Sequence, residues 1–220
     1  MDAYEHLYNA PDINMILDTI NEMFDKANKG MFVVCHGRYH AMFAVNTVEN
    51  ILTSLLYDLR IVELGKIAAL LHDIGNIAGR WNHAKKSAVL ARVMLDGSDH
   101  LSSEEKDMVI QAIEDHGNGE NLSSPIGAAL LFADKADFSR KRYLDFVISE
   151  NRHFNNLEIE EMDIFISDNT IIINAVATEA FSEEVFINEY SNYSILLKAA
   201  KYLGCTCQVR INNKKVTFAK

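Results

Sequence analysis

The sequence places imidazole and carboxylate side chains where helices would turn them inward. Eight histidines are present, and five of them lie on an apolar helix face or at a helix end: His36, His40, His72, His83 and His116. A single histidine in such a place is usually a hydrogen-bonded core or surface residue, so these histidines gain meaning only together with acids. Imidazole and carboxylate ligands in one cluster suit Mn, Fe, Zn, Ni or Co, and suit Mg less well.

The dipeptide His72-Asp73 stands in the most demanding context. In the stretch LLHDIGN it follows aliphatic residues and precedes Gly75, which is typical of a helix end. Neighbouring side chains point about 100° apart on a helix, so both could reach one ion only near that end. The alternative is a surface terminus with both groups in water, but the apolar residues 67–71 favour burial. An ionised buried aspartate needs a partner, and a metal ion is such a partner.

Three further histidines and one more acid share this pattern of a polar group within apolar sequence. His40 begins the apolar stripe of RYHAMFAVNTVENIL, and His83 opens the helix HAKKSAVLARVML. His116 ends a helix before a glycine-containing loop, and Asp134 is surrounded by apolar residues in AALLFADKADF. Each of these is weak evidence alone, and their order along the chain is what points to one site.

This order of motifs resembles the HD superfamily of metal-dependent phosphohydrolases. The matching sequence motifs are RYH, AALLHDIG, HAKKSA and LLFADKADFSRKR. The resemblance covers about residues 30–150. It implies an all-helical core with the metal site between helices. It also implies two metal ions that share a bridging Asp73, the first held by His40, His72, Asp73 and Asp134 and the second by His83, His116 and Asp73.

The chain departs from one known class of this superfamily. The HD-GYP phosphodiesterases have lysine in place of Asn76, a His-His pair in place of Asp115-His116 and a GYP signature in place of GNGENLSSP. A cyclic-di-GMP phosphodiesterase is therefore disfavoured. His36 lies one helical turn before His40, where some trinuclear members carry glutamate, but a hydrogen-bonding role at the helix start is favoured for it.

The resemblance predicts phosphoryl transfer by a metal-activated water, with two ions about 3.5 to 4 Å apart across Asp73. Negative charge develops on the nonbridging oxygens in such a reaction, so cations should lie near the site. The alternative for each cation is a place on a solvated helix face. We predict catalytic roles for Asp73, Asp115 and Lys135, and substrate binding by Arg38, Arg80, Lys85 and Arg140.

Trp81, the only tryptophan, lies two residues before His83 in the stretch GRWNH. It could stack on a nucleobase, with Arg80 holding a phosphate beside it. The favoured alternative is an aromatic side chain that packs this loop against the core.

Helices must position these residues, and the apolar spacing is helical up to about residue 150. The segments around Gly97 and over residues 117–124 are the clearest loops, and Ser102 with Glu105 predicts a capping box. The predicted helices span residues 12–28, 39–59, 61–73, 83–96, 103–115, 125–138 and 139–150.

The pattern changes after about residue 155, where MDIFISDNTIIINAVAT alternates in the manner of a strand. The predicted elements are strands 161–167 and 170–177 turning at Asp168-Asn169, a helix over about 182–203 ending at Gly204, and a hairpin turning at Asn212-Asn213. The predicted fold class is therefore mainly α. It has an all-helical HD-domain core at residues 1–155 and a small C-terminal α+β (ββαββ) appendage at residues 156–220.

Composition limits the partners and the compartment. A net charge of −10 and a pI near 5.2 argue against general nucleic-acid binding, which depends on Lys and Arg. No run approaches the roughly 20 apolar residues that a membrane-spanning helix needs. Three cysteines cannot pair completely, which favours a reducing cytoplasm.

Three functions are consistent with these patterns. We predict a cytoplasmic metal-dependent phosphohydrolase that cleaves a small phosphate ester, with a nucleotide or dinucleotide as the favoured substrate. The alternatives are a hydrolase or lyase of a non-phosphate substrate on the same scaffold, and a metal-containing sensor or binding module. The full set of ligands favours catalysis. The appendage could pair with a second copy of the chain in a homodimer.

Overall fold

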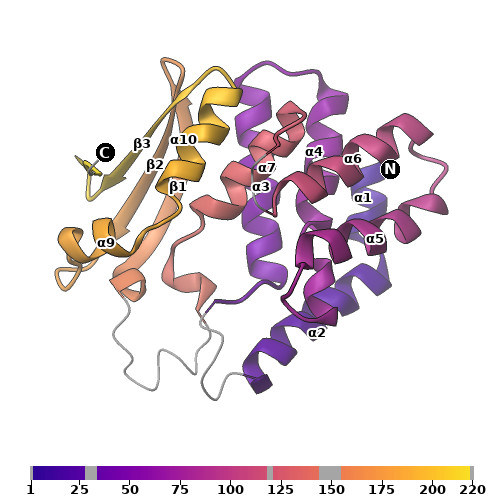
Figure 1. The fold of residues 1–220 in the computed structure, drawn as a ribbon, viewed down its shortest axis with the longest axis horizontal. Coiled ribbons are helices and arrows are strands. Elements are labelled where there is room, and N and C mark those ends of the chain that lie inside the picture. The colour runs from indigo at the N-terminus through magenta and orange to yellow at the C-terminus, as the bar shows by residue number, and fades with distance from the viewer. Residues whose placement is uncertain (1, 28–33, 118–120, 144–154, 219–220) are drawn as a thin grey trace.

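The computed structural model describes residues 2–27, 34–117, 121–143 and 155–218. Helices occupy one side of the molecule and a four-stranded sheet lies on the other (Figure 1). The last helix, α10 (Tyr193–Tyr202), lies between the sheet and the helical side (Figure 1). The fold is therefore mainly α with a small α+β appendage, as the sequence predicts.

The helical side is built around α7, which is almost wholly buried, and α4, whose last turns from Ile67 to Leu71 are buried. In α7 every residue from Ile126 to Ala136 except Lys135 is buried. The helices of this side are α1 (Ala3–Tyr8), α2 (Pro11–Ala27), α3 (Arg38–Ser54), α4 (Leu59–Leu71), α5 (His83–Asp96), α6 (Ser103–Asp115) and α7 (Pro125–Ala136), with short 3₁₀ helices η1 (Ile74–Ala78), η2 (Arg140–Arg142) and η3 (Asn155–Glu158).

Local side chains determine where several of these helices begin. Ser102 accepts a hydrogen bond from the backbone N–H of Glu105, and the Glu105 side chain accepts one from Ser102, so the predicted capping box is present. Asp58 caps α4 by accepting from the N–H of Arg60. Ser124 caps α7, whose first residue is a proline. These signals involve neighbours in sequence, so the helix starts follow from the sequence.

The sheet has the order β1-β2-β3-β4. β1 (Ile159–Ser167) pairs antiparallel with β2 (Thr170–Ala177), β2 pairs parallel with β3 (Thr206–Ile211), and β3 pairs antiparallel with β4 (Lys214–Lys215). Both hairpins turn through two residues with positive φ, at Asp168-Asn169 and Asn212-Asn213. Both predicted hairpins are confirmed, one on each side of the helical segment.

The single helix predicted over residues 182–203 is wrong, because the structure has two helices there, α9 (Glu183–Glu189) and α10. Tyr190 ends α9 with a ψ of 78°, and its hydroxyl donates to the carbonyl of Lys135 at 2.7 Å. Its ring also stacks on Phe186. The contact with Lys135 is long-range, and we infer that it outweighs the local helical pattern at Tyr190.

Two other predictions about helices need correction. α1 is a helix that the sequence pattern did not predict. In the segment predicted as helix 139–150, the structure describes Ser139, η2 and Tyr143, and residues 144–150 lie outside the described residues. The buried apolar core continues from the helices into the sheet without a break. No helix among the described residues is long and apolar enough to cross a membrane.

Candidate metal centre

The dipeptide His72-Asp73 lies in the protein interior at the end of α4. Leu71 is the last residue of that helix, His72 is its C-cap, and the chain then turns into η1. Asp73 is 1% exposed and His72 is 0% exposed. The alternative of a solvated helix terminus is therefore wrong.

Gly75 allows α5 to approach this turn closely. Its φ is not positive, so it is not the left-handed residue that would end a helix. A Cβ on Gly75 would lie 2.4 Å from the backbone nitrogen of Ser87 and 2.5 Å from the carbonyl oxygen of His83. The Gly75 N–H also donates to Ser87 Oγ at 2.9 Å. This close approach carries His83 to the neighbourhood of Asp73.

A first set of four buried side chains meets at this point from three helices. The first turn of α3 supplies His40, α7 supplies Asp134, and the end of α4 supplies His72 and Asp73. His40 Nε2 lies 3.1 Å from Asp134 Oδ1 and 3.3 Å from His72 Nε2. One possible ligand atom from each of the four lies within 4.8 Å of the others. This spacing suits coordination of one metal ion.

A second set shares Asp73 with the first. Asp73 Oδ1 lies 3.4 Å from His83 Nε2 and 3.8 Å from His116 Nε2. The other oxygen, Oδ2, lies 3.4 Å from His72 Nε2 and 3.7 Å from His40 Nε2. The two oxygens of one carboxylate therefore face two different pairs of histidines.

Backbone carbonyls determine which ring nitrogens point into the centre. His72 Nδ1 lies 2.7 Å from the carbonyl oxygen of Ala69, and His116 Nδ1 contacts the carbonyl oxygen of Ile113. A carbonyl oxygen can only accept, so Nδ1 donates in both rings. The neutral form of each ring then carries its lone pair on Nε2, which is the atom that faces Asp73.

Asp137, which the sequence analysis did not select, orients the His40 ring in the same way. Its Oδ2 accepts from His40 Nδ1 at 2.8 Å, and Asp137 is 4% exposed. The lone pair of His40 is therefore also directed inward from Nε2. A carboxylate behind a ligating histidine is a common arrangement in metal sites.

This donor set fits a divalent transition metal. Lone pairs of facing imidazoles converge, with His72 Nε2 3.3 Å from His40 Nε2 and His116 Nε2 3.2 Å from His83 Nε2. A facing pair of ring nitrogens can share at most one hydrogen, so each pair leaves lone pairs directed at the centre. Imidazole nitrogens with carboxylate oxygens around them are the ligands of Mn, Fe, Zn, Ni and Co.

The electrostatics favour the ionised carboxylates that a metal ion requires. Burial alone would raise the pKa of Asp73, but His72 beside it holds that pKa well below its usual range. Burial would also raise the pKa of Asp134, but Lys135 beside it holds that pKa well below its usual range. Burial lowers the pKa of His116 to about 3, so this ring is neutral near pH 7. Asp73 raises the pKa of His72 against burial, so metal binding there would displace a proton.

His36 positions Asp73 in this structure. Its Nδ1 lies 2.7 Å from Asp73 Oδ2, and its Nε2 lies 2.7 Å from Nη1 of Arg80. Arginine can only donate, so Nε2 accepts and Nδ1 carries the hydrogen that Asp73 receives. Burial lowers the pKa of His36 to about 4, which keeps the ring neutral. The hydrogen-bonding role favoured from the sequence agrees with these contacts.

Arg142 is a second residue that the sequence analysis missed. It is 8% exposed, and its Nη2 lies 3.1 Å from His40 Nε2 and 3.7 Å from Asp134 Oδ1. The nearby motif ADKADFSRKR contains both Asp137 and Arg142, so a signal was present. Arg140 of that motif was predicted to bind substrate, but it is Arg142 that the structure turns inward.

The other predicted cations divide into two groups. Lys135 lies at the centre, with Nζ 2.6 Å from Asp134 Oδ2. Arg38 instead forms an ion pair with Asp18 of α2 at 2.9 Å, and Arg140 forms one with Glu160 at 3.2 Å. The structure therefore does not bring Arg38 and Arg140 to the centre, because acids on neighbouring elements hold them.

Asp115 also has a different place from the one predicted for a catalytic residue. Its Oδ2 accepts from the backbone N–H of Ser123 at 3.0 Å and from Ser123 Oγ at 2.6 Å. Its Oδ1 accepts from Gln111 at 2.9 Å. Asp115 thus fastens the segment before α7 to the end of α6, and it is not among the clustered ligand atoms of the described residues.

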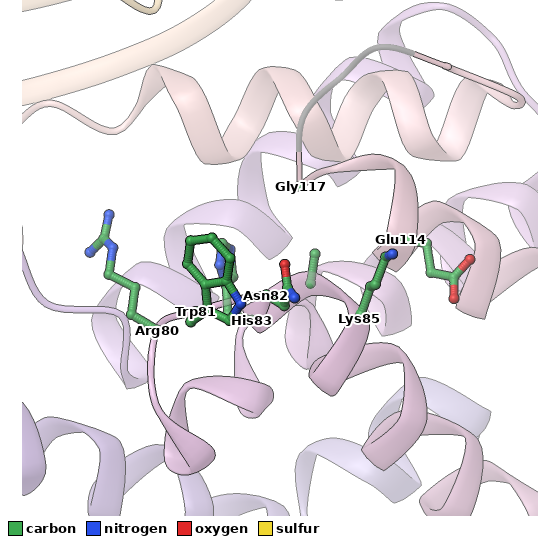
Figure 2. A pocket seen from close by; sticks show the side chains of 8 residues that line it. Arg80, Trp81, Asn82, His83, Lys85, Glu114 and Gly117 are labelled. Atoms are coloured by element: carbon green, nitrogen blue, oxygen red, sulfur yellow. The ribbon is translucent and has the colours of Figure 1, made fainter.

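An open pocket on the surface reaches His83, one of the two histidines of the second set. Its volume is about 530 Å³, within the range of small-molecule sites. Figure 2 shows Trp81 standing beside His83, with Arg80 on one side and Lys85 and Glu114 on the other. The wall is formed by Arg80, Trp81, Asn82, His83, Ala84, Lys85, Glu114 and Gly117. A ligand can therefore reach His83 from solvent.

Comparisons with known proteins identify a similar family and similar structures. A family model described as the HD domain matches residues 47–172, which include every predicted ligand except His40. Among solved structures, 9 chains match. One is the crystal structure of a predicted HD superfamily hydrolase from an uncultured Thermotogales bacterium, with 24% identity, a TM-score of 0.44, and coverage of 62% of this chain and 74% of that chain. A search of curated proteins finds no match.

Proposed function

Because this chain belongs to the HD domain family, we propose that it is a metal-dependent phosphohydrolase acting on a small phosphate ester. The proposal rests on the orientation of the Asp73 carboxylate. Its two oxygens face different pairs of histidines. A carboxylate so placed can bridge two ions. A nucleotide or dinucleotide is the substrate class we favour, in a cytoplasmic protein.

We propose that two divalent ions share Asp73. The residues that would hold them are His40, His72, Asp73 and Asp134 for the first and Asp73, His83 and His116 for the second. The bound metals would supply Lewis acidity and lower the pKa of a water molecule. Mn, Fe, Zn, Ni or Co suits the histidine-rich set better than Mg does.

The protein's own cations would stabilise the phosphoryl group. Arg142 and Lys135 lie against Asp134, one on each oxygen, at 3.7 and 2.6 Å. Arg80 and Lys85 line the pocket that opens to His83. Such positively charged groups orient the nonbridging oxygens of the phosphoryl group. They also neutralise the negative charge that develops on these oxygens during transfer. Asp73 is held for this reaction by His36 and by Asn76, whose Nδ2 donates to Asp73 Oδ1 at 2.9 Å.

The same cations separate this proposal from its alternatives. A lyase or hydrolase of a non-phosphate substrate would have little use for Arg142 and Lys135 at the centre and for Arg80 and Lys85 in the pocket wall, whereas a phosphate ester is anionic. The full set of possible metal ligands favours catalysis over a metal-containing sensor or binding module. Asp115 no longer has a part in the proposed chemistry, because it contacts Ser123.

We also propose that residues 1–155 form the catalytic unit and that residues 156–220 are an appendage that supports it. Tyr190 of the appendage donates to the carbonyl of Lys135 at 2.7 Å, next to the predicted ligand Asp134. Its ring and that of Phe186 lie 5.0 and 5.1 Å from the ring of Phe138. These contacts would hold the end of α7 in place. Pairing of two appendages in a homodimer remains part of the proposal.

Metal content and phosphatase activity test this function together. Purified protein should contain about two transition-metal equivalents and should hydrolyse at least one member of a panel of nucleotides, dinucleoside polyphosphates and simple phosphate esters. Asp73→Ala should lose both metal and activity. Asp107→Ala is the matched control, because Asp107 is exposed and forms an ion pair with the surface residue Arg92. Hydrolysis that persists in Asp73→Ala would contradict the proposal.

A further inference from the structure

Trp81 is held in solvent beside the candidate metal centre. It is 83% exposed, so the sequence-based alternative of an aromatic packed against the core is wrong. A tryptophan buries more apolar surface than almost any other side chain when it has a partner, so the open indole offers a large contact surface to a ligand. Trp81 lies in the wall of the pocket that reaches His83 (Figure 2).

The loop that carries Trp81 is braced rather than loose. Lys86 Nζ donates to the carbonyl oxygens of Ala78 and Gly79 at 2.8 and 3.0 Å. Asn82 has a left-handed conformation with a φ of 53°, and it directly precedes α5. The indole is thus presented on a fixed turn two residues before a predicted ligand. A rigid aromatic side chain loses little entropy when a ligand stacks on it.

The charges around the indole match an anionic group attached to a flat ring. Arg80, the residue before Trp81, is joined through His36 to Asp73 by two contacts of 2.7 Å. No carboxylate within the described parts of the chain forms an ion pair with Arg80. Its guanidinium can therefore bind a phosphate at the side of the pocket nearest the centre, while the indole contacts the rest of the ligand.

We propose that Trp81 is the stacking platform for the base of a nucleotide and determines the preference for nucleotides over phosphate esters without a ring. This inference rests on the proposed function, because it places the phosphate at the metal centre. Every nucleobase has a π-face, and stacking on an aromatic side chain contributes about 1 to 3 kcal/mol per base, or about 5- to 150-fold in affinity. The indole is therefore expected to distinguish a nucleotide from its sugar phosphate.

Intrinsic fluorescence provides a test that does not depend on turnover. Trp81 is the only tryptophan, so all indole emission comes from the proposed platform. Adenosine 5′-monophosphate should quench this emission with saturation, and ribose 5-phosphate at the same concentration should not. Quenching that depends on protein concentration instead of on the nucleotide would identify Trp81 as a contact between copies of the chain and would overturn the inference.

Variants of Trp81 test its effect on specificity. Trp81→Ala should lower the ratio of kcat/KM for adenosine 5′-monophosphate to that for ribose 5-phosphate by about 5- to 150-fold, and Trp81→Phe should keep most of the ratio. Val93→Ala is the control. Val93 is 69% exposed on α5, the helix that begins two residues after Trp81, and it does not line the pocket. An unchanged ratio in Trp81→Ala would overturn the inference.

The two proposals can fail separately. Saturable quenching by the nucleotide without hydrolysis of any ester would contradict the phosphohydrolase and leave the stacking platform supported. Equal hydrolysis of adenosine 5′-monophosphate and ribose 5-phosphate, without quenching, would support the phosphohydrolase and contradict the platform.

Discussion

Asp137→Asn should weaken metal binding without unfolding the protein. The Asp137 carboxylate accepts from His40 Nδ1 at 2.8 Å and is buried. Asparagine has nearly the same shape, so the packing is kept. The amide has no negative charge, however, and it can present its NH₂ to the ring in place of an oxygen. Both changes reduce the electron density that His40 can offer through Nε2.

The magnitude follows from the position of Asp137 directly behind one proposed ligand. Removing such a supporting group typically costs 10- to 100-fold in metal affinity, or about 1.4 to 2.7 kcal/mol. Among the proposed ligands Asp137 contacts His40, which belongs to the first set, so one of the two proposed ions should be affected. Its Oδ2 also lies 3.9 Å from Nε of Arg142. The carbonyl of Asp137 still accepts from Arg142 Nη1 at 3.1 Å, so this backbone contact is retained in the variant.

Competition with a chromophoric chelator measures the two metal affinities, and urea denaturation measures the free energy of unfolding. Asp115→Asn is the matched control, because Asp115 is also a buried aspartate next to a histidine in sequence but hydrogen-bonds to Ser123. It should lose about 1 to 3 kcal/mol of stability through that contact. Its metal affinities should remain those of the unmodified protein.

Two results would refute this reasoning. If Asp137→Asn binds both metals as tightly as the unmodified protein, the contact with His40 does not support a ligand. If Asp115→Asn loses metal as strongly as Asp137→Asn, the loss reflects general disturbance of the interior and the placement of Asp115 outside the centre is wrong.

Two other predictions concern stability and packing. In metal-free protein the free energy of unfolding should fall as pH decreases below about 6.5, by up to about 3 kcal/mol per group, because the pKa values of His36 and His116 are lowered to about 4 and about 3 and only the unfolded chain then takes up protons. The raised pKa of His72 opposes this trend, and a flat profile between pH 6.5 and 4 in urea denaturation would contradict it. Gly75→Ala should cost about 1 to 3 kcal/mol and release the metal at His83 first, because the new Cβ would meet backbone atoms of α5 at 2.4 and 2.5 Å. Gly97→Ala meets no atom within 4 Å and should be neutral, so equal effects of the two substitutions on stability and metal content would count against the packing argument.

Several elements could be predicted from the sequence because their causes are local. The bounds predicted for α5 and α6, residues 83–96 and 103–115, are those of the structure. The capping box of Ser102 and Glu105 acts over three residues. The hairpin turns need only two residues that tolerate positive φ, which Asp168-Asn169 provide. In each case the deciding contacts lie within one turn of chain.

The helix predicted over residues 182–203 shows where such local signals fail. No proline or glycine interrupts that segment, yet the chain leaves the helix at Tyr190. The hydroxyl of Tyr190 reaches the carbonyl of Lys135, 55 residues earlier. A periodic pattern cannot register a contact with a distant backbone atom.

The sequence by itself determined which residues could form a metal centre, because their chemical types, their order and their apolar surroundings are properties of the chain. Only the tertiary structure decided how they are used. It divided the two oxygens of Asp73 between two pairs of histidines, selected Arg142 over Arg140, and placed Asp137 behind His40 from 97 residues away. The physical reason is that ligand orientation depends on distances of about 3 Å between helices, which only packing determines.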